Sequence, residues 1–230
     1  MVAKKPVGVI DYSVDGLSGG LISSWLKVPF SVIKVTEGEQ FPSLSAEDFS
    51  AVIHSGSSLS IVADRSFMDG AIAFVKQSVE TGVPQMGICY GHQLLARAIT
   101  GFDAVAKCDG IEIGWQEVDF LAQWPVPGLV GKKAVWQSHY DCVVKIPPGS
   151  VITATNDHTE IQAFMNRTMK LFGTQFHPEF DRKKGNECFA KDADLFEQNN
   201  IDLQEVLASG PGFPTGEIVF DHFLQTFRQE

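Results

Sequence analysis

The cysteine at position 89 stands between Gly87 and Gly91 in the stretch MGICYGHQ. An apolar run precedes it and a helical pattern follows, so Cys89 falls at a strand-to-helix turn of the nucleophile-elbow type. Such a turn crowds the backbone, which explains why residues without a Cβ stand on either side. The first helical turn directs N–H groups at the sulfur and favours the thiolate. We therefore predict that Cys89 is a nucleophile and that the Tyr90 N–H stabilises an oxyanion.

A base for this thiol is predicted in the segment FGTQFHPEF, residues 172–180. His177 and Glu179 lie two residues apart in an extended segment, so their side chains emerge on the same face. Pro178 between them stiffens the chain. A carboxylate beside an imidazole fixes its tautomer and stabilises the imidazolium formed after proton transfer. A His-Pro-Glu segment alone is also typical of a surface strand end, and only its combination with Cys89 favours catalysis.

The other histidines have less specific surroundings. His92 follows Cys89 by three residues on the predicted helix, which directs it along the helix wall, so we expect a helix-packing or hydrogen-bonding role. His139 and His158 lie in strand or turn contexts without a ligand-spacing partner, and the chain has neither an HExxH motif nor an EF-hand loop. We therefore expect neither a metal nor a cofactor.

The elements that position these residues alternate in the first half of the chain. Apolar runs predict strands and spacings of three and four predict helices. The predicted strands are residues 6–11, 30–35, 51–56 and 83–88, and the predicted helices are 19–26, 65–81 and 91–101. This alternation predicts a three-layer α/β fold, with an open, mostly parallel sheet and helices on both faces.

After residue 103 the pattern changes to shorter strands separated by turns. The predicted strands are 112–120, 133–139 and 150–156, followed by a hairpin of 160–165 with 170–177. We expect them to extend the sheet so that it is mixed at one edge. Residues 216–227 place Ile218, Phe220, Phe223 and Phe227 largely on one face of a last helix, which we expect to dock onto the body.

Composition excludes several classes of protein. The 230 residues are 44% hydrophobic and 20% charged, which fits one domain over residues 1–230. A net charge of −10 argues against nucleic acid or an anionic membrane as partner, since the only dense basic run, Arg182 to Lys184, reads as a solvated turn. Four cysteines without a CxxC pair fit a reducing, cytoplasmic setting, and we find no signal peptide or membrane span.

Four blocks of the chain together resemble the class I glutamine amidotransferases, most closely the glutaminase domain of GMP synthetases and its stand-alone relatives. The blocks are SGSSLSIVAD (55–64), GICYGHQLLA (87–96), WQSHYDCVVKIPPG (136–149), and IQAF (161–164) followed by GTQFHPEF (173–180). The resemblance implies a flavodoxin-like core. The order of histidine before acid, only two residues apart, also differs from that of α/β-hydrolases, where the acid comes first.

The resemblance implies roles for particular residues. Cys89 would attack the side-chain amide of glutamine to form a thioester, His177 would act as base and then as acid, and Glu179 would orient it. The N–H groups of Ser57 and Tyr90 would form the oxyanion hole. The residues implied in substrate binding are Gly56, Gln93, Ser138, His139 and Tyr140.

Three functions stay open from the sequence. The first is a glutaminase that passes ammonia to a synthetase, which we expect to be a separate subunit because no nucleotide-binding synthetase domain follows within the 230 residues. The second is a γ-glutamyl peptidase or hydrolase, because Tyr140 replaces a glycine usual in GMP synthetases and would shape a wider pocket. The third is a non-catalytic binding or regulatory homologue, which an intact set of Cys89, His177 and Glu179 argues against.

Overall fold

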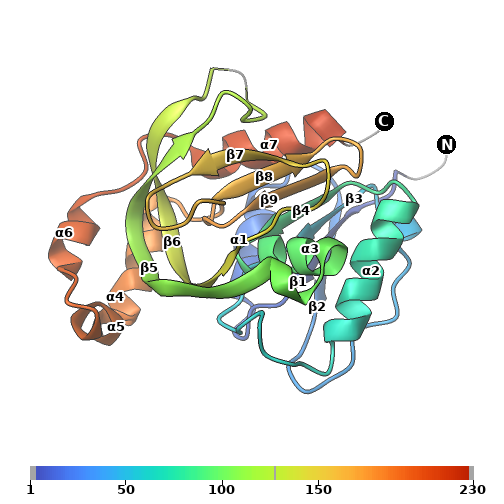
Figure 1. Cartoon of the computed structure of the whole chain (residues 1–230), viewed down its shortest axis with the longest axis horizontal. Helices are drawn as coiled ribbons and strands as arrows, with labels where there is room; N and C mark the ends of the chain where they lie inside the picture. The colour runs from blue at the N-terminus through green and yellow to red at the C-terminus, as the bar shows by residue number, and fades with distance from the viewer. Residues whose placement is uncertain (1–3, 127, 228–230) are drawn as a thin grey trace.

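The computed structural model describes residues 4–126 and 128–227. Its strands are β1 (Val7–Asp11), β2 (Phe30–Lys34), β3 (Ala51–His54), β4 (Gln85–Ile88), β5 (Val105–Phe120), β6 (Gly131–Val143), β7 (Val151–Thr155), β8 (Ala163–Asn166) and β9 (Leu171–Thr174). Within these residues they form one sheet in the order β2-β1-β3-β4-β9-β8-β7-β5-β6 (Figure 1).

The sheet changes character at β9. The strands β2, β1, β3, β4 and β9 pair in parallel, and β8, β7, β5 and β6 continue the sheet antiparallel. The predicted hairpin is confirmed, with Asn166 opposite Leu171. Every residue of β1, β3 and β4 is buried, because helices cover both faces, and this explains why these strands read as continuous apolar runs.

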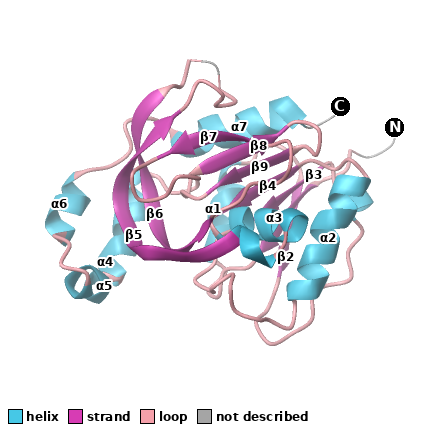
Figure 2. Ribbon diagram, viewed as in Figure 1, coloured by secondary structure: helices cyan, strands magenta, loops and turns pink. Residues whose placement is uncertain are grey.

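Helices cover both faces of the parallel half (Figure 2). One face carries α1 (Leu17–Trp25) and α7 (Thr215–Phe227), and the other carries α2 (Met68–Glu80) and α3 (Tyr90–Thr100). Two 3₁₀ helices lie at Ala46–Asp48 and Phe102–Ala104. Strand alternation sends Val9 to the α1/α7 side and Ile10 to the α2/α3 side. The predicted three-layer α/β fold with a mixed edge is confirmed.

The two longest strands exceed their predicted bounds. The prediction of short strands at 112–120 and 133–139 is wrong in length, because β5 begins at Val105 and β6 spans Gly131–Val143. The pairing shifts register between Lys107 and Glu112, and Gly110 there has a φ of 83°. Exposed charged residues and a glycine in this irregular stretch interrupt the alternation that would have marked it as strand.

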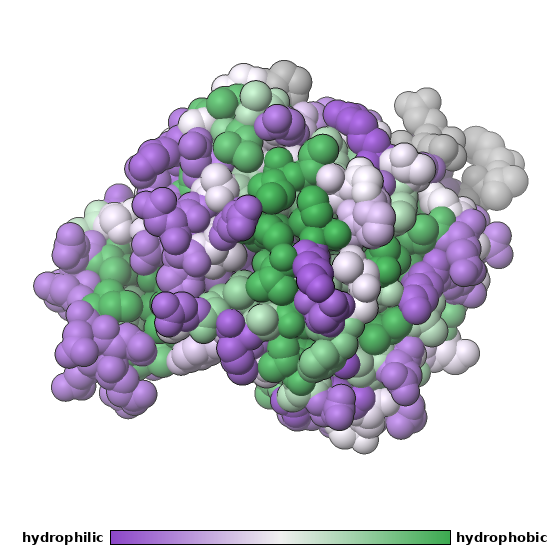
Figure 3. All heavy atoms as spheres, viewed as in Figure 1, coloured by the Kyte–Doolittle hydropathy of each residue, from purple (hydrophilic) through white to green (hydrophobic). Residues whose placement is uncertain are grey.

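Three helices beside β5 and β6 were not predicted. They are α4 (Arg182–Lys191), α5 (Ala193–Gln198) and α6 (Leu203–Ala208). The basic run predicted as a turn is the first turn of α4, where the Lys184 N–H donates to the Asp181 carboxylate at 2.7 Å. Few of their residues are buried, so the helical period is faint in the sequence. Figure 3 shows hydrophobic residues scattered among the charged ones at this end of the molecule.

These three helices pack through a small aromatic core. Phe189 of α4 and Phe196 of α5 are fully buried, and they pack with the nearly buried Trp115 of β5 and Trp136 of β6. The Phe189 and Trp136 rings stack with their centroids 5.0 Å apart. The unit made by α4, α5 and α6, here called the helical cap, is thereby fixed to the β5–β6 hairpin. Throughout the described residues, every helix is too short or too polar to cross a membrane.

Candidate active site

Three neighbouring parallel strands end at the same edge of the sheet. In the register, His54 of β3 lies beside Gly87 of β4, and Ile88 of β4 lies beside Thr174 of β9. The segments that follow these strands begin at Ser55, at Cys89 and at Gln175. Because the carboxyl ends of parallel strands meet, residues from three distant parts of the chain gather in one place.

The turn at Cys89 is strained and tightly packed. Cys89 has a φ of 48° and a ψ of −104°, and holding a non-glycine residue in so sparsely populated a region costs about 1–3 kcal/mol. Its N–H donates to the Thr174 carbonyl at 2.8 Å. A Cβ on Gly87 would lie 2.4 Å from the Gly91 backbone, and one on Gly91 would lie 2.3 Å from the His54 carbonyl oxygen. The steric explanation for these glycines is confirmed.

His177 is held by a carboxylate and by aromatic rings. Its Nδ1 lies 2.8 Å from Glu179 Oε1, and both side chains are buried. The Trp136 ring meets the imidazole edge-on at 4.8 Å between centroids. The backbone N–H of His177 donates to the backbone carbonyl of Trp136. Trp25 of α1 donates from Nε1 to the Glu179 carbonyl at 3.0 Å. The imidazole orientation is therefore determined from three elements.

The electrostatic surroundings keep a proton on His177. Burial alone would lower its pKa, but the negative charges of Glu179 and Cys89, together with hydrogen bonds to both side chains, raise the pKa to about 10. At neutral pH the ring is therefore an imidazolium, with a sulfur on one side and a carboxylate on the other. Such an arrangement can supply a nucleophilic thiolate and a proton for a leaving group.

The loop after β3 is fixed close to His177. The Ser55 N–H donates to the Ile10 carbonyl at 3.0 Å, and the Ser55 hydroxyl donates to Asp11 at 3.3 Å. A Cβ on Gly56 would lie 2.5 Å from His177 Cε1, so the loop backbone touches the imidazole. Within the described part of the chain, the N–H groups of Ser57 and Tyr90 have no acceptor. The oxyanion-hole role of these two N–H groups stays a prediction.

A cavity of about 340 Å³, here called the thiol cavity, opens at Cys89. It gathers most of the residues predicted to bind substrate; those on its wall are Gln93, Ser138, His139 and Tyr140, together with Ser57. The Gln93 side chain donates from Nε2 to the Asp141 carbonyl at 2.7 Å and to Gln175 Oε1 at 3.1 Å. Tyr140 is 49% exposed at the rim. Substrate binding by these residues stays a prediction.

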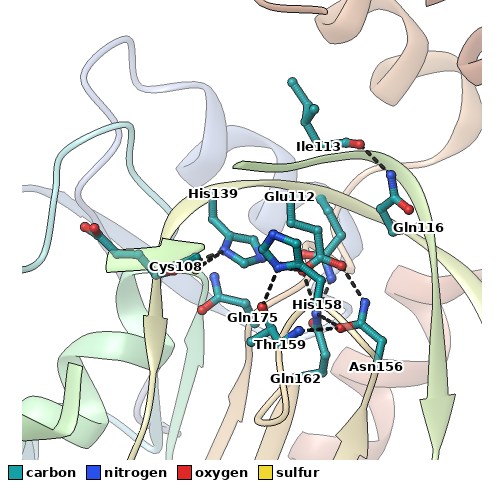
Figure 4. Close-up of polar contacts among 12 residues, drawn as sticks. Cys108, Glu112, Ile113, Gln116, His139, Asn156, His158, Thr159, Gln162 and Gln175 are labelled. Carbon is teal, nitrogen blue, oxygen red and sulfur yellow. Dashed lines mark hydrogen bonds and ion pairs between the residues drawn. The ribbon is translucent and has the colours of Figure 1, made fainter. Parts of the chain in front are cut away.

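His139 belongs to a buried polar cluster around Glu112 (Figure 4). His139 Nε2 lies 2.8 Å from Glu112 Oε2, and Gln162 donates to the same oxygen at 2.7 Å while Asn156 donates to the other. Burial would raise the pKa of Glu112, but the hydrogen bond and charge of His139 lower it. The imidazole of His139 is thus engaged in holding the segment that lines the thiol cavity.

Sequence reasoning did not identify four charged residues in or beside the cavity wall. Glu112 does not line the thiol cavity, whereas Lys107, Asp141 and Asp192 do, Asp192 from the helical cap. Lys107 lies 2.7 Å from Asp141, which also accepts from the Ser60 hydroxyl. A charged residue inside the otherwise apolar stretch IEIGW was a signal for Glu112. No pattern in the sequence links Asp192 to Cys89.

The other histidines lie elsewhere. His92 is fully buried against Phe164, with ring centroids 4.9 Å apart, and burial lowers its pKa to about 3, which agrees with the predicted packing role. His54 is also buried, with a pKa lowered to about 4. Among the described residues, no group of three or more His, Cys, Asp or Glu side chains is arranged to hold a metal ion.

A family model described as glutamine amidotransferase class-I matches residues 23–194, which include Ser55 to Ser57, Cys89, His177 and Glu179. The chain belongs to the class-I glutamine amidotransferase family. The resemblance drawn from the four sequence blocks is confirmed at this level.

Other class-I glutamine amidotransferase relatives agree with the match. The chain is 34% identical over 145 residues to one subunit of the glutamine-hydrolyzing GMP synthase of Sulfurisphaera tokodaii, covering 62% of this chain and 74% of that protein. It is 37% identical over 142 residues to the GMP synthase of Leifsonia xyli, covering 59% of this chain but 28% of that protein.

Solved structures of amidotransferases share the fold. A glutamine amidotransferase from Thermotoga maritima has a TM-score of 0.81 at 19% identity, covering 99% of this chain and 100% of that one. One from Methylobacillus flagellatus has a TM-score of 0.79 at 22% identity, covering 99% and 97%. The likeness therefore extends over the helical cap.

Proposed function

We propose that this amidotransferase hydrolyses the γ-amide of glutamine through a thioester on Cys89 and supplies the ammonia to a separate synthetase subunit. The observation that supports this most is the placement of His177 between Cys89 and Glu179 at the ends of adjacent strands, with 2.8 Å between imidazole and carboxylate. A binding protein that merely retained the fold has no need of a strained cysteine beside a buried imidazolium.

In the proposed first step, the Cys89 thiolate bonds to the γ-carbonyl carbon. The oxyanion that forms lies toward the N–H groups of Ser57 and Tyr90. The carbon–nitrogen bond then breaks, and the His177 imidazolium gives its proton to the leaving nitrogen. Losing one such backbone donor typically costs about 3 kcal/mol of transition-state stabilisation.

In the second step, water resolves the thioester. The neutral His177 imidazole takes a proton from water while the water oxygen bonds to the acyl carbon. The carbon–sulfur bond breaks, which releases glutamate and restores the thiolate and the imidazolium. Glu179 stays ionised throughout and holds the ring through Nδ1, so its role is positioning and charge stabilisation.

The partner is proposed from the relatives. The Sulfurisphaera tokodaii protein is named as one subunit of a GMP synthase, whereas the Leifsonia xyli chain carries the matching part within a longer protein. The likeness to the Sulfurisphaera tokodaii subunit, which is matched over 74% of its length, supports a glutaminase component of a two-chain enzyme.

Replacing the sulfur tests the mechanism directly. We expect Cys89→Ser to lower glutamate release from glutamine by about 10⁴-fold or more, because the hydroxyl is not ionised by this imidazole. Cys142→Ser is the control, since Cys142 is a half-buried free thiol outside the proposed catalytic set and the cavity wall, and it should keep full activity. Glutamate release would be measured with and without the candidate synthetase subunit. Undiminished activity in Cys89→Ser would contradict the mechanism.

A further inference from the structure

A second cavity, here called the imidazole cavity, adjoins the thiol cavity. It has a volume of about 480 Å³ and has His177 in its wall, whereas Cys89 is in the wall of the thiol cavity. The two cavities share Ser57, Ser58, Ser138 and Asp192. The proposed reaction centre therefore lies between two spaces, one beside the nucleophile and one beside the acid.

The wall of the imidazole cavity has an apolar part and a charged part. Leu17 and Leu21 of α1 line one side, and Leu17 is 39% exposed although it is a large apolar residue. Trp136 and Phe180, stacked with centroids 4.3 Å apart, contribute a flat aromatic surface next to His177. The charged part of the wall consists of Asp15, Lys184, Glu187, Lys191 and Asp192. Lys184 is paired with Glu187 at 2.9 Å, so within the described part of the chain Lys191 is the lysine of this wall that forms no ion pair, and it is exposed.

Proton transfer decides which part of a substrate enters this cavity. The acid must reach the leaving nitrogen, so any substituent on that nitrogen extends from the imidazole side while the acyl group stays on the thiol side. Ammonia is about the size of a water molecule, which occupies roughly 30 Å³ in the liquid. The imidazole cavity is therefore far larger than the release of ammonia requires, and its volume is typical of a small-molecule site.

We propose that the imidazole cavity is a leaving-group site, and that the same thioester chemistry cleaves γ-glutamyl amides of apolar amino acids. This inference rests on the proposed function of Cys89 and His177. The apolar side chain of the leaving amino acid packs on Leu17, Leu21 and Phe180, and its carboxylate pairs with Lys191. The carbon–nitrogen bond breaks as before, the proton of His177 goes to the α-nitrogen, the free amino acid leaves, and water resolves the thioester to glutamate.

Wild-type protein without a synthetase subunit provides the first measurement. The substrates are glutamine, γ-glutamylleucine and γ-glutamyl-isopentylamide, which keeps the apolar group but lacks the carboxylate. We expect kcat/KM for γ-glutamylleucine to exceed that for glutamine by about tenfold or more, with the isopentylamide in between, because each added group is bound in the transition state.

Variants of the wall provide the second measurement. We expect Leu17→Trp and Leu21→Trp each to lower the ratio of kcat/KM for γ-glutamylleucine to that for glutamine by about tenfold. Two positions are used because Leu21 is half-buried against the core of the helical cap. Ser24→Trp is the matched control, since Ser24 is exposed on the same helix outside the cavity, and should leave the ratio unchanged. Lys191→Gln should lower the rate for γ-glutamylleucine but not that for the isopentylamide.

The outcomes separate this inference from the proposed function. If glutamine is cleaved and rates fall steadily as the amine grows, the leaving-group site is overturned and the glutaminase stands. If γ-glutamylleucine is cleaved while glutamine is not, even with a synthetase subunit, the site stands and the ammonia supply fails. If the Trp variants change kcat/KM for γ-glutamylleucine and for glutamine by the same factor, the imidazole cavity does not select the leaving amine, and the leaving-group site is overturned. If no substrate is cleaved and Cys89 resists a glutamine-like electrophile, both proposals fail.

Discussion

At the scale of single residues, the site depends on contacts that leave no room for an extra atom. Gly56 is the sharpest case, because a Cβ there would lie 2.5 Å from His177 Cε1. No positive φ is involved, so alanine is compatible with the backbone, and the ring rather than the loop has to move. The absence of a side chain at Gly56 therefore leaves the space that the His177 ring occupies.

We predict that Gly56→Ala lowers kcat for glutamine hydrolysis by about 100-fold, because a displacement of the acid by about 1 Å is enough for such a loss. Gly20→Ala is the control, since a Cβ at Gly20 on α1 meets nothing within 4 Å. Steady-state kinetics and the urea midpoint would be measured for both. A Gly56→Ala protein with normal kcat would show that the imidazole tolerates the displacement.

The charge of Glu179 should be visible in the pH dependence of activity. The folded-state pKa of His177, about 10, lies above its unfolded value, so the imidazolium stabilises the fold below about pH 6.5 and this contribution is lost as pH rises through 10. The Glu179→Gln substitution removes one of the negative charges that raise the pKa of His177. We expect the alkaline limb of kcat/KM to move down by about one pH unit or more. An unchanged limb would show that Glu179 acts only by geometry.

Residue types at short spacing were enough to predict Cys89, His177 and Glu179, because the glycines and the His-Pro-Glu segment express local geometry. Glu112 could not be predicted in the same way. Its partners His139, Asn156 and Gln162 come from other parts of the chain, and only the fold brings them together.

At the scale of elements, the β5–β6 hairpin is held to the sheet by a buried carboxylate side chain. Glu112 of β5 satisfies donors from β6 and from the segment between β7 and β8. Residues 138–140, which line the thiol cavity, lie directly opposite on β6. The shape of the cavity therefore depends on a carboxylate that does not line it.

We predict that Glu112→Leu lowers the free energy of unfolding by about 3 kcal/mol, because buried donors lose their charged acceptor. Glu117→Leu, exposed on the same strand, should change it by no more than about 0.5 kcal/mol. Urea unfolding would be followed at several pH values. Since the pKa of Glu112 is lowered, the difference from wild type is present above about pH 4.5 and is lost below the folded pKa. Equal stability of the two variants would contradict this.

Elements of the parallel half were predicted well and the helical cap was not. Strands that are buried on both faces have continuous runs of apolar residues, which are easy to recognise in the sequence, as in β1 and β3. The cap buries only Gly185 and Phe189 in α4 and Phe196 in α5, so its sequence reads as polar loop. The spacing of seven between the two phenylalanines was the available signal.

At the scale of the whole molecule, the last helix closes the core on one face of the sheet. Val219, Phe220, Phe223 and Phe227 of α7 are buried against Ile22 of α1 and the strands. The expected docking of residues 216–227 is confirmed for the three phenylalanines, whereas Ile218 is only half-buried and Val219 is buried next to it. Helix α1 also carries Trp25, whose Nε1 donates a hydrogen bond to the Glu179 carbonyl. The helices on this face of the sheet therefore help to position Glu179.

We predict that Phe220→Ala destabilises the fold by about 3–5 kcal/mol, since a fully buried aromatic ring is lost from a packed core. Gln225→Ala, exposed on the same helix, should stay within about 0.5 kcal/mol of wild type. Chemical denaturation would compare the two. A small loss in Phe220→Ala would mean that α7 adds little to the stability of the body.

The pairing of β4 with β9 has a consequence for how the protein comes into being. The strand that presents the sulfur is complete at Ile88, but its parallel neighbour, which carries the imidazole into place, ends at Thr174. During synthesis on the ribosome, the antiparallel half is made between these two strands. In the proposed mechanism, Cys89 therefore has no catalytic base until the later strand has emerged and inserted, and thioester chemistry is possible only in the completed fold.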